Sequence, residues 1–316
     1  MSSRNSFFIF ARHCFTDTII LLVLLLLTAC SGNEDSKVDF SKTVQVSRPD
    51  GPNLDRPSLR VAVGAMISPK ETFIYYRQIL DYIASGLGRS VELVQRKTYS
   101  EVNELIGKGE IDVAFICSGP YVSGREKYGF ELLATPEVKG SHFYQSYLIV
   151  NSDSPVQSLS DLRNRVFAFT DPDSHSGKLV PTFWLSEIHE HPDTFFGKTV
   201  YTYSHDNSIL AVSRGLVDGA AVDSLIWEYY NLKNPSLTAR TRIIKRSESF
   251  GIPPVVASKF FPSEMKTRVR EILLAMHEDP EGSKILHELM IDRFVAPQEK
   301  WYDAIREVER EIEATK

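Results

Sequence analysis

This sequence has few cysteines and only a small excess of acidic over basic residues. Three cysteines in 316 residues are too few for a disulfide-stapled scaffold, and the odd number prevents all of them from pairing within the chain. The formal net charge of −5 excludes the broad basic surface that nonspecific nucleic-acid binding needs. With 17 glycines and 16 prolines, the composition also excludes collagen and low-complexity chains. A chain of this length has room for two lobes that each bury a core.

Long hydrophobic runs are equally rare, and the most apolar one is short. Residues 19–27 form an unbroken apolar run after Arg4 and Arg12, too short for a comfortable transmembrane helix. The string LTAC follows and resembles the lipobox of bacterial lipoproteins. We therefore predict a signal peptide over residues 1–29, cleavage before Cys30, and acylation of its sulfur. A plain secretory signal and an uncleaved anchor are the alternatives.

A polar segment separates this signal from the rest of the chain. Residues 30–58 include three prolines and two glycines and lack apolar periodicity, which predicts a flexible tether. A tether and a lipid anchor together predict an exported protein held at the periplasmic face of a bacterial membrane. No later segment has the length or purity to cross a bilayer.

Beyond the tether, apolar strand-like runs alternate with segments of helical spacing. This alternation predicts an α/β fold of two lobes, each with a parallel sheet covered by helices. Lobe I is expected to comprise residues 59–147 and 248–316, with residues 148–247 inserted as lobe II. Ligands of open α/β sheets bind beyond the carboxyl ends of the strands, so the ligand cleft is expected between the lobes.

Four turns after predicted strands carry the chemistry. Residues 171–178 place Ser174, Ser176 and Gly177 at a helix start, where free N–H groups and the helix dipole favour an anion. The other three turns hold His205, the pair Cys117 and Tyr121, and Asp223. Each also has a plain structural interpretation: a helix cap for the serines and Asp223, a surface histidine, and a small buried hydrophobe for Cys117.

Enzyme motifs are missing around these residues. There is no G-x-S-x-G elbow and no Walker A loop, so a hydrolase using Ser174 or Ser176 with His205 and Asp223 is not supported. A metal site on residues 189–191 is disfavoured, because side chains two apart on a helix point away from each other. We expect a binding protein that has no cofactor and no metal.

Three segments resemble the PhnD family of periplasmic substrate-binding proteins, which serve phosphate, phosphite and phosphonate ABC transporters. The segments are DVAFICSGPYV, FAFTDPDSHSGKLVPTFWL and YTYSHDNSILAVSRGLVDGAAVDSLIWE, in that order. The resemblance implies a two-lobed type-II periplasmic binding fold that closes on an oxyanion. It also implies an oxyanion loop at residues 174–177, with His175 where Thr is commoner. The other ligand residues that it implies are His205, Tyr121, Tyr76 or its neighbour Tyr75, and Asp223.

The resemblance leaves the ligand and the partner open. Relatives that bind aminophosphonates carry an acid just after an Ile-Pro, whereas here Ile252-Pro253 is followed by Pro254, which favours phosphite, phosphate or methylphosphonate. Cys117 raises arsenite as an alternative, because a thiolate suits a soft ligand. The partner is either an ABC permease or a membrane histidine kinase, and we expect the protein itself to be a monomer.

Overall fold

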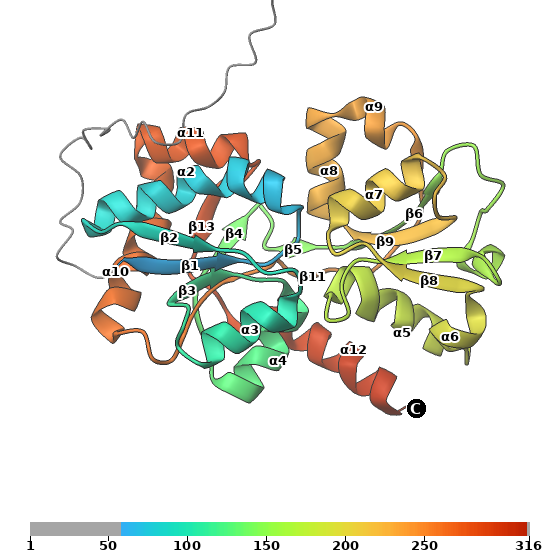
Figure 1. Cartoon of the computed structure of the whole chain (residues 1–316), viewed down its shortest axis with the longest axis horizontal. Helices are drawn as coiled ribbons and strands as arrows, with labels where there is room; N and C mark the ends of the chain where they lie inside the picture. Colours follow the sequence, from blue (N-terminus) through green and yellow to red (C-terminus); the bar gives the residue numbers. More distant parts are fainter. Residues whose placement is uncertain (1–57, 315–316) are drawn as a thin grey trace, which may run out of the picture. The chain divides into compact units, whose positions relative to one another are not determined.

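The computed structural model describes residues 58–314, which form two α/β lobes, each built on its own sheet (Figure 1). The first lobe has a six-stranded sheet. In spatial order its strands are β13 (Arg293–Val295), β4 (Glu131–Glu137), β12 (Val255–Ala257), β3 (Val113–Phe115), β1 (Leu59–Val63) and β2 (Val91–Val94).

This sheet is mixed, which corrects the expectation of a parallel one. β1 runs parallel to β2 and β3, as strands joined by crossover helices do, but β12 runs antiparallel to both β3 and β4. β12 is the strand by which the chain returns from the second lobe, so it enters the sheet from the opposite end. Its residues are fully buried because it lies in the middle of the sheet.

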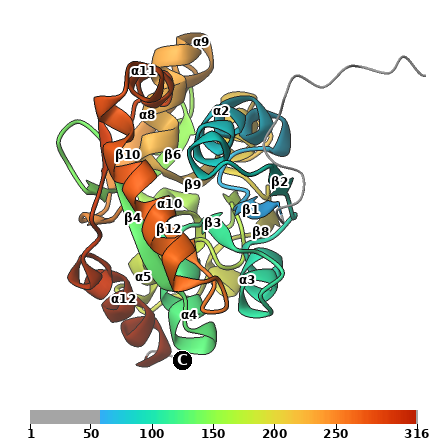
Figure 2. The same ribbon diagram turned by 90° about the vertical axis from the view of Figure 1, so that its left-hand side faces the viewer.

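Helices cover both faces of the first sheet (Figures 1 and 2). On one face, Ile79, Leu80 and Ile83 of a long helix share a buried cluster with Val269 and Leu273. The spacing of three and four residues puts them on one side of that helix. The helices of this lobe are α2 (Pro69–Leu87), α3 (Tyr99–Gly107), α4 (Ser118–Tyr128), α10 (Ser263–Ala275), η3 (Met276–Glu278) and α11 (Pro280–Glu288).

The second lobe has a five-stranded sheet. In spatial order its strands are β10 (Thr241–Arg246), β6 (Ser146–Asn151), β9 (Gly219–Asp223), β7 (Val166–Phe169) and β8 (Lys198–Tyr201). The expectation of a parallel sheet is wrong here too, because β6 runs antiparallel to both β10 and β9. Its helices are η1 (Leu159–Leu162), η2 (His175–Leu179), α5 (Val180–Ser186), α6 (Pro192–Phe195), α7 (His205–Ser213), α8 (Ser224–Lys233) and α9 (Pro235–Thr238).

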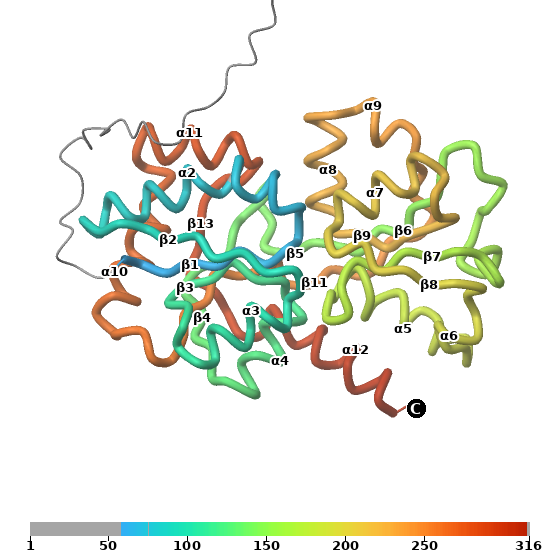
Figure 3. The backbone as a smooth tube through the Cα atoms, in the orientation of Figure 1, coloured from blue at the N-terminus to red at the C-terminus, as the bar shows by residue number. Residues whose placement is uncertain are grey.

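Two segments cross between the lobes, and they pair with each other. β5 (Phe143–Tyr144) and β11 (Phe250–Gly251) form a two-stranded antiparallel sheet between the larger sheets (Figures 1 and 3). A Cβ on Gly251 would lie 2.7 Å from the carbonyl oxygen of Trp301, so only glycine allows this approach. The crossing therefore packs closely against the backbone of Trp301.

The chain ends with a short turn, η4 (Glu299–Tyr302), and the helix α12 (Asp303–Ala314). Ile305, Val308 and Ile312 of α12 belong to a buried cluster with Val122 of the first lobe and Trp184 of the second. The last helix thus packs on both lobes.

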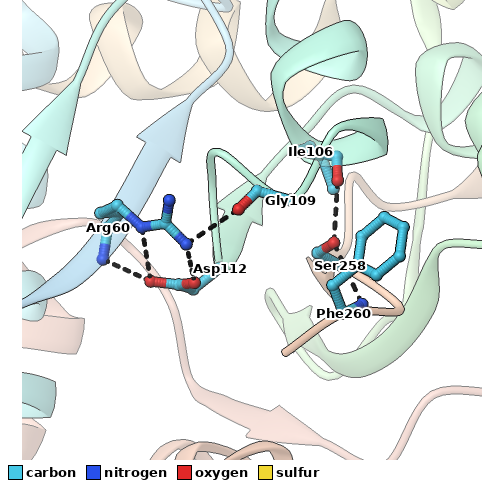
Figure 4. Close-up of polar contacts among 6 residues, drawn as sticks. All are labelled: Arg60, Ile106, Gly109, Asp112, Ser258 and Phe260. Carbon is cyan, nitrogen blue, oxygen red and sulfur yellow. Dashed lines mark hydrogen bonds and ion pairs between the residues drawn. The ribbon is translucent and has the colours of Figure 1, made fainter. Parts of the chain in front are cut away.

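Polar contacts remote from the crossing hold the first lobe together (Figure 4). Arg60 on β1 pairs with Asp112, and its guanidinium also donates to the carbonyl of Gly109 at 2.9 Å. Ser258, after β12, donates to the carbonyl of Ile106 at 2.8 Å and so ties the end of α3 to the returning strand. Within residues 58–314, no helix has the length and apolarity needed to span a membrane. The predicted signal peptide, the predicted acylation site Cys30 and the predicted tether lie outside the described residues, except Ser58.

Candidate functional site

The loop from β7 into η2 carries the predicted oxyanion-binding residues. Ser174 caps η2 by accepting from the N–H of Gly177 at 3.0 Å, whereas Ser176 keeps a buried Oγ without a hydrogen-bond partner. A Cβ on Gly177 would lie 2.4 Å from Thr170 Oγ1, so glycine is required here. The Ser176 hydroxyl can therefore both donate to and accept from a ligand, and Ser174, whose oxygen accepts in this cap, can still donate its O–H.

The expected helix over 176–190 begins instead with a π-helical turn and ends at Ser186. Pro181 explains the wide turn, because it has no N–H for the Gly177 carbonyl. That carbonyl accepts from the N–H of Thr170 instead, at 3.3 Å. The turn is thereby fixed to the end of β7.

His175 is buried, and its ring and its backbone N–H have different surroundings. Its ring packs edge-on against Phe250 with centroids 4.2 Å apart, and neither ring nitrogen has a partner. Its backbone N–H is directed at the sulfur of Cys117, across the boundary between the lobes. Burial lowers the pKa of His175 to about 3, so the ring is neutral. The backbone group is therefore the part of His175 that meets the other predicted residues.

His205 opens α7 and is held by the end of β9. Its Nδ1 accepts from the backbone N–H of Asp223 and lies at the same distance, 3.1 Å, from Thr170 Oγ1. Its Nε2 is buried without a partner, and burial lowers its pKa to about 3. A neutral ring that accepts at Nδ1 carries its proton at Nε2. His205 thus presents one N–H donor.

Asp223 caps α8, accepting at Oδ1 from the N–H of Leu225 at 2.7 Å. The contact of Asp223 with His205 is made by its backbone N–H, which donates to Nδ1 of the ring. Burial raises the pKa of Asp223 to about 7. Near neutral pH the carboxyl is therefore protonated more readily than an ordinary aspartate, and its protonated form can donate a hydrogen bond.

Cys117 is the residue before α4 and faces the second lobe. The backbone N–H groups of His175 and Gly119 point at its sulfur, and burial raises the pKa of the thiol to about 12. A Cβ on Gly119 would lie 3.1 Å from the carbonyl oxygen of Asp173. Glycine at this position lets the two lobes approach closely.

Not all of the tyrosines that were predicted to bind the ligand lie at the site. Tyr121 does not join the site: its hydroxyl donates to Glu299 at 2.7 Å, and its ring packs against Tyr302. It shares a helix face with Ser118, which donates to the carbonyl of Gly251, whereas the neighbouring Gly119 faces the second lobe. The side chain of Tyr75 lies outside the described residues.

Tyr76 packs on Phe115 with ring centroids 5.3 Å apart, and it lies within electrostatic range of Asp223. Burial, with a smaller effect of Asp223, raises the pKa of Tyr76 to about 12. Its phenol is therefore a neutral group at the edge of the site.

Two further tyrosines belong to the site although the sequence interpretation missed them. Tyr99, at the start of α3, and Tyr144, in β5, both have buried hydroxyls that make no hydrogen bond of normal geometry within residues 58–314, although the side chains of Ser118 and Ser176 lie close enough to act on the Tyr144 hydroxyl. Burial raises the pKa of each phenol well above its usual value, and Cys117 and Asp223 act on both. Tyr99 follows a strand-to-helix turn, a signal that could have found it. Tyr144 lies in the crossing, where no such pattern applies.

These residues define one group, which we call the cradle: Tyr99, Cys117, Tyr144, Ser176, His205 and Asp223. None is lysine or arginine, so its free groups are neutral hydroxyls, a neutral imidazole N–H and a partly protonated carboxyl. A set of converging neutral donors in a buried site is suited to holding an oxyanion by hydrogen bonds. Metal coordination would instead require deprotonated ligands.

Comparison with known proteins identifies the family to which the chain belongs. The family model for the periplasmic substrate-binding protein of phosphonate ABC transporters matches residues 61–302. The phosphonates-binding periplasmic protein of Escherichia coli (strain K12) is 25% identical over 208 residues, 64% of this chain and 61% of that protein. A probable ABC transporter phosphite binding protein, PhnD1 of Prochlorococcus marinus (strain MIT 9301), is 26% identical over 182 residues, 56% of this chain and 61% of that protein.

The chain thus spans about three fifths of the length of these two curated relatives. A solved binding-protein component of a phosphonate ABC transporter from Pseudomonas aeruginosa superposes with a TM-score of 0.78 at 23% identity. The superposition covers 83% of this chain and 88% of that one, and it shows the same two-lobed type-II binding fold. With most of its length matched, this chain belongs to the family of periplasmic substrate-binding proteins of phosphonate ABC transporters, a family of binding proteins and not of enzymes.

Proposed function

We propose that the protein captures a small phosphorus oxyanion, a phosphonate, phosphite or phosphate, in the cradle between its lobes. One observation carries the proposal: four buried polar atoms of the cradle, contributed by both lobes and the crossing, make no hydrogen bond of normal geometry within residues 58–314, although the Tyr144 hydroxyl lies near those of Ser118 and Ser176. They are the hydroxyls of Tyr99, Tyr144 and Ser176 and Nε2 of His205. Each unsatisfied buried group costs about 1–3 kcal/mol, so a ligand that accepts from all four offsets a large penalty.

The charge state of the cradle supports the same ligand class. His205 is neutral and donates through Nε2, and the hydroxyls donate without carrying charge. When the Asp223 carboxyl is protonated, its O–H is a further donor. An oxyanion with one oxygen beside this carboxyl could accept that hydrogen bond. The named relatives bind phosphonates and phosphite, which is the ligand class proposed here.

Backbone contacts across the lobe boundary support a closing mechanism. The N–H of His205 donates to the carbonyl of Met66 at 2.9 Å, and the N–H of Ser68 donates to Asp206 at 2.9 Å. Tyr99 likewise donates its backbone N–H to Asp171 at 3.2 Å. Lobes joined by these bonds enclose the cradle, and we propose that the closed form delivers its ligand to an ABC permease.

Isothermal titration tests the ligand class directly. We expect phosphite, phosphate or methylphosphonate to bind with micromolar or tighter affinity. Aminoethylphosphonate should bind more weakly, because no acid follows Ile252-Pro253 to pair with its ammonium group. The absence of heat with every phosphorus oxyanion, in protein that melts cooperatively, would overturn the proposal.

Arsenite sensing is the second candidate, and Cys117 is the observation behind it. Its sulfur lies in the cradle, yet its pKa of about 12 keeps it a thiol, which is a poor ligand for a soft ion. We therefore place the phosphorus oxyanion first. Arsenite titration of the wild type and Cys117→Ser, followed by tryptophan fluorescence, decides between them: a response that only the wild type shows would favour arsenite. A neighbouring kinase gene would favour sensing, and a permease gene transport.

Membrane attachment through Cys30 is the remaining part of the proposal. The LTAC string at residues 27–30 supports acylation of this cysteine, which would keep the binding domain close to its permease. Cell fractionation of the wild type and Cys30→Ala tests it. The wild type should sediment with membranes and the variant should not enter the lipid-modified pool. Equal incorporation of labelled fatty acid in both would contradict the anchor.

A further inference from the structure

A cavity of about 340 Å³ lies beside the cradle and is distinct from it. Tyr144 and Asp223 line it at one end, and both also belong to the cradle. From there it extends between α8 of the second lobe and the segment that joins α11 to β13 of the first. Ile226 lines the wall on α8, and Ile291 lines the opposite wall. A ligand held in the cradle has this cavity as its neighbour.

The inner part of the cavity is apolar and aromatic. Tyr76 packs against Phe115 with ring centroids 5.3 Å apart, and Phe115 packs against Phe294 at 6.4 Å, in both cases edge to face. Met66 lines the same space and also belongs to a small buried cluster with Tyr99 of the cradle. The apolar wall of the cavity is therefore continuous with the cradle through the cluster that Met66 shares with Tyr99.

The charges that line the cavity leave no partner for an ammonium group away from the anion. Besides Asp223, the charged lining residues are Lys139 and Glu228, which pair with each other at 3.7 Å. Both side chains are substantially exposed, so the pair lies at the rim. Pro253 and its neighbour Ile252 line the opposite side without an acid beside them. An uncharged substituent fits such a lining, because burying an unpaired ammonium is costly.

The volume also exceeds what a bare oxyanion needs. Cavities that hold organic ligands start at roughly 300 Å³, and their walls are mainly apolar with a few polar groups at one end. Here the polar end is the cradle. We propose that this cavity receives the uncharged alkyl or aryl substituent of an organophosphonate whose oxyanion lies in the cradle. The inference rests on the proposed function and specifies its substrate class.

A ligand series measures this inference by isothermal titration. Phosphite and methylphosphonate report on the cradle alone, and propyl-, butyl- and benzylphosphonate report on the cavity. Burial of each methylene should strengthen binding about threefold to fourfold, so butylphosphonate should bind tens of times more tightly than methylphosphonate. Aminoethylphosphonate, similar in length to propylphosphonate, should show no such gain.

A filled cavity supplies the matched variant. Ile291→Trp places a large ring in the cavity from the first lobe, and it should abolish the gain from methyl to butyl while leaving methylphosphonate binding within about twofold. Leu289→Trp does the same from a neighbouring position, in case the first variant does not fold. Ile188→Trp is the control, because Ile188 is 46% exposed and is not among the residues lining the cavity. It should keep the whole series unchanged.

The outcomes separate the two proposals. If methylphosphonate binds but longer alkyl groups bind equally or more weakly, the inference fails and the proposed function stands. If the gain survives in both filled variants, the substituent lies elsewhere and the inference is again wrong. If butanol alone binds as well as butylphosphonate, the cavity is a general apolar site unrelated to the anion. If no phosphorus oxyanion binds at all, the proposed function fails and the inference fails with it.

Discussion

The backbone N–H of Asp223 donates to Nδ1 of His205 at 3.1 Å. Because this bond occupies Nδ1 as an acceptor, it selects the tautomer of the ring that is protonated at Nε2. Burial lowers the pKa of His205 to about 3, so the ring stays neutral throughout the physiological range. A strand end in the second lobe thus determines which hydrogen the site offers to a ligand.

Replacing this histidine should weaken ligand binding. His205→Asn removes the Nε2–H donor, and we expect the affinity for the bound oxyanion to fall about tenfold to a hundredfold, the range for a hydrogen bond to a charged group. Nitrogen NMR of the wild type should show a neutral Nε2–H tautomer at pH 6. An imidazolium signal at that pH would contradict the assigned tautomer.

Two tyrosine substitutions should have opposite effects. Tyr99→Phe removes a buried hydroxyl that has no partner, so thermal stability should be unchanged or slightly higher while affinity falls about tenfold. Tyr302→Phe removes a hydroxyl that donates to the carbonyl of Ile252 at 3.0 Å, so it should lower stability by about 1 kcal/mol. Melting curves and titrations of both proteins test this pair. Equal affinity of Tyr99→Phe and wild type would remove Tyr99 from the cradle.

Affinity should fall at alkaline pH because of Asp223. Burial raises its pKa to about 7, and above that pH the ionised carboxylate repels the anion that its protonated form binds. If only the protonated form binds, each pH unit above 7 costs about tenfold in affinity. Asp223→Asn keeps a neutral donor at this position, so its affinity should not follow that decline. Titrations at pH 6, 7, 8 and 9 compare the two, and parallel profiles would contradict the assignment.

The same group affects stability without ligand. Its pKa is raised from 3.8 to about 7 by folding, so the folded state holds a proton that the unfolded chain has lost between those values. This contribution is fully present below pH 3.8 and is lost as the pH rises through 7. Asp223→Asn should therefore flatten this part of the stability profile.

A methyl group at the lobe boundary should hinder closure. In Gly119→Ala, the added Cβ would lie 3.1 Å from the carbonyl oxygen of Asp173 and 3.3 Å from Cβ of His175. We expect weaker oxyanion binding, by about tenfold, and a larger radius of gyration in X-ray scattering. Gly64→Ala is the matched control, because its new Cβ would meet no atom closer than 3.5 Å. Unchanged binding in Gly119→Ala would show that the closed lobes tolerate the methyl group.

The sequence was informative wherever local patterning decides the structure. The turns at 171–177 and 204–206 were expected between an apolar strand and a helix. In the structure each one does join a strand to a helix. The fold class followed from the same alternation. The register of β12 against β3 did not, because it depends on how the chain returns from the other lobe.

The site was harder to predict because its residues meet across long distances in the chain. Tyr121 was expected at the cleft, but Glu299 accepts from its hydroxyl 178 residues later, a contact without local signal. Tyr144 contributes from a two-residue strand whose partner is Phe250. His205 was expected at a turn beside the cleft, but the group that holds its ring was not, since a backbone N–H carries no signature in the sequence.

Helix α12 has a consequence for the energetics of capture. Its apolar side chains pack with Val122 of one lobe and Trp184 of the other, so separating the lobes has to expose part of that surface to water. We therefore expect the helix to favour the arrangement of the lobes described here before any ligand is bound. A protein that is already biased toward closure loses less of its intrinsic affinity to the conformational equilibrium. On this expectation, changes that detach the last helix from either lobe would weaken ligand binding without altering any residue of the cradle.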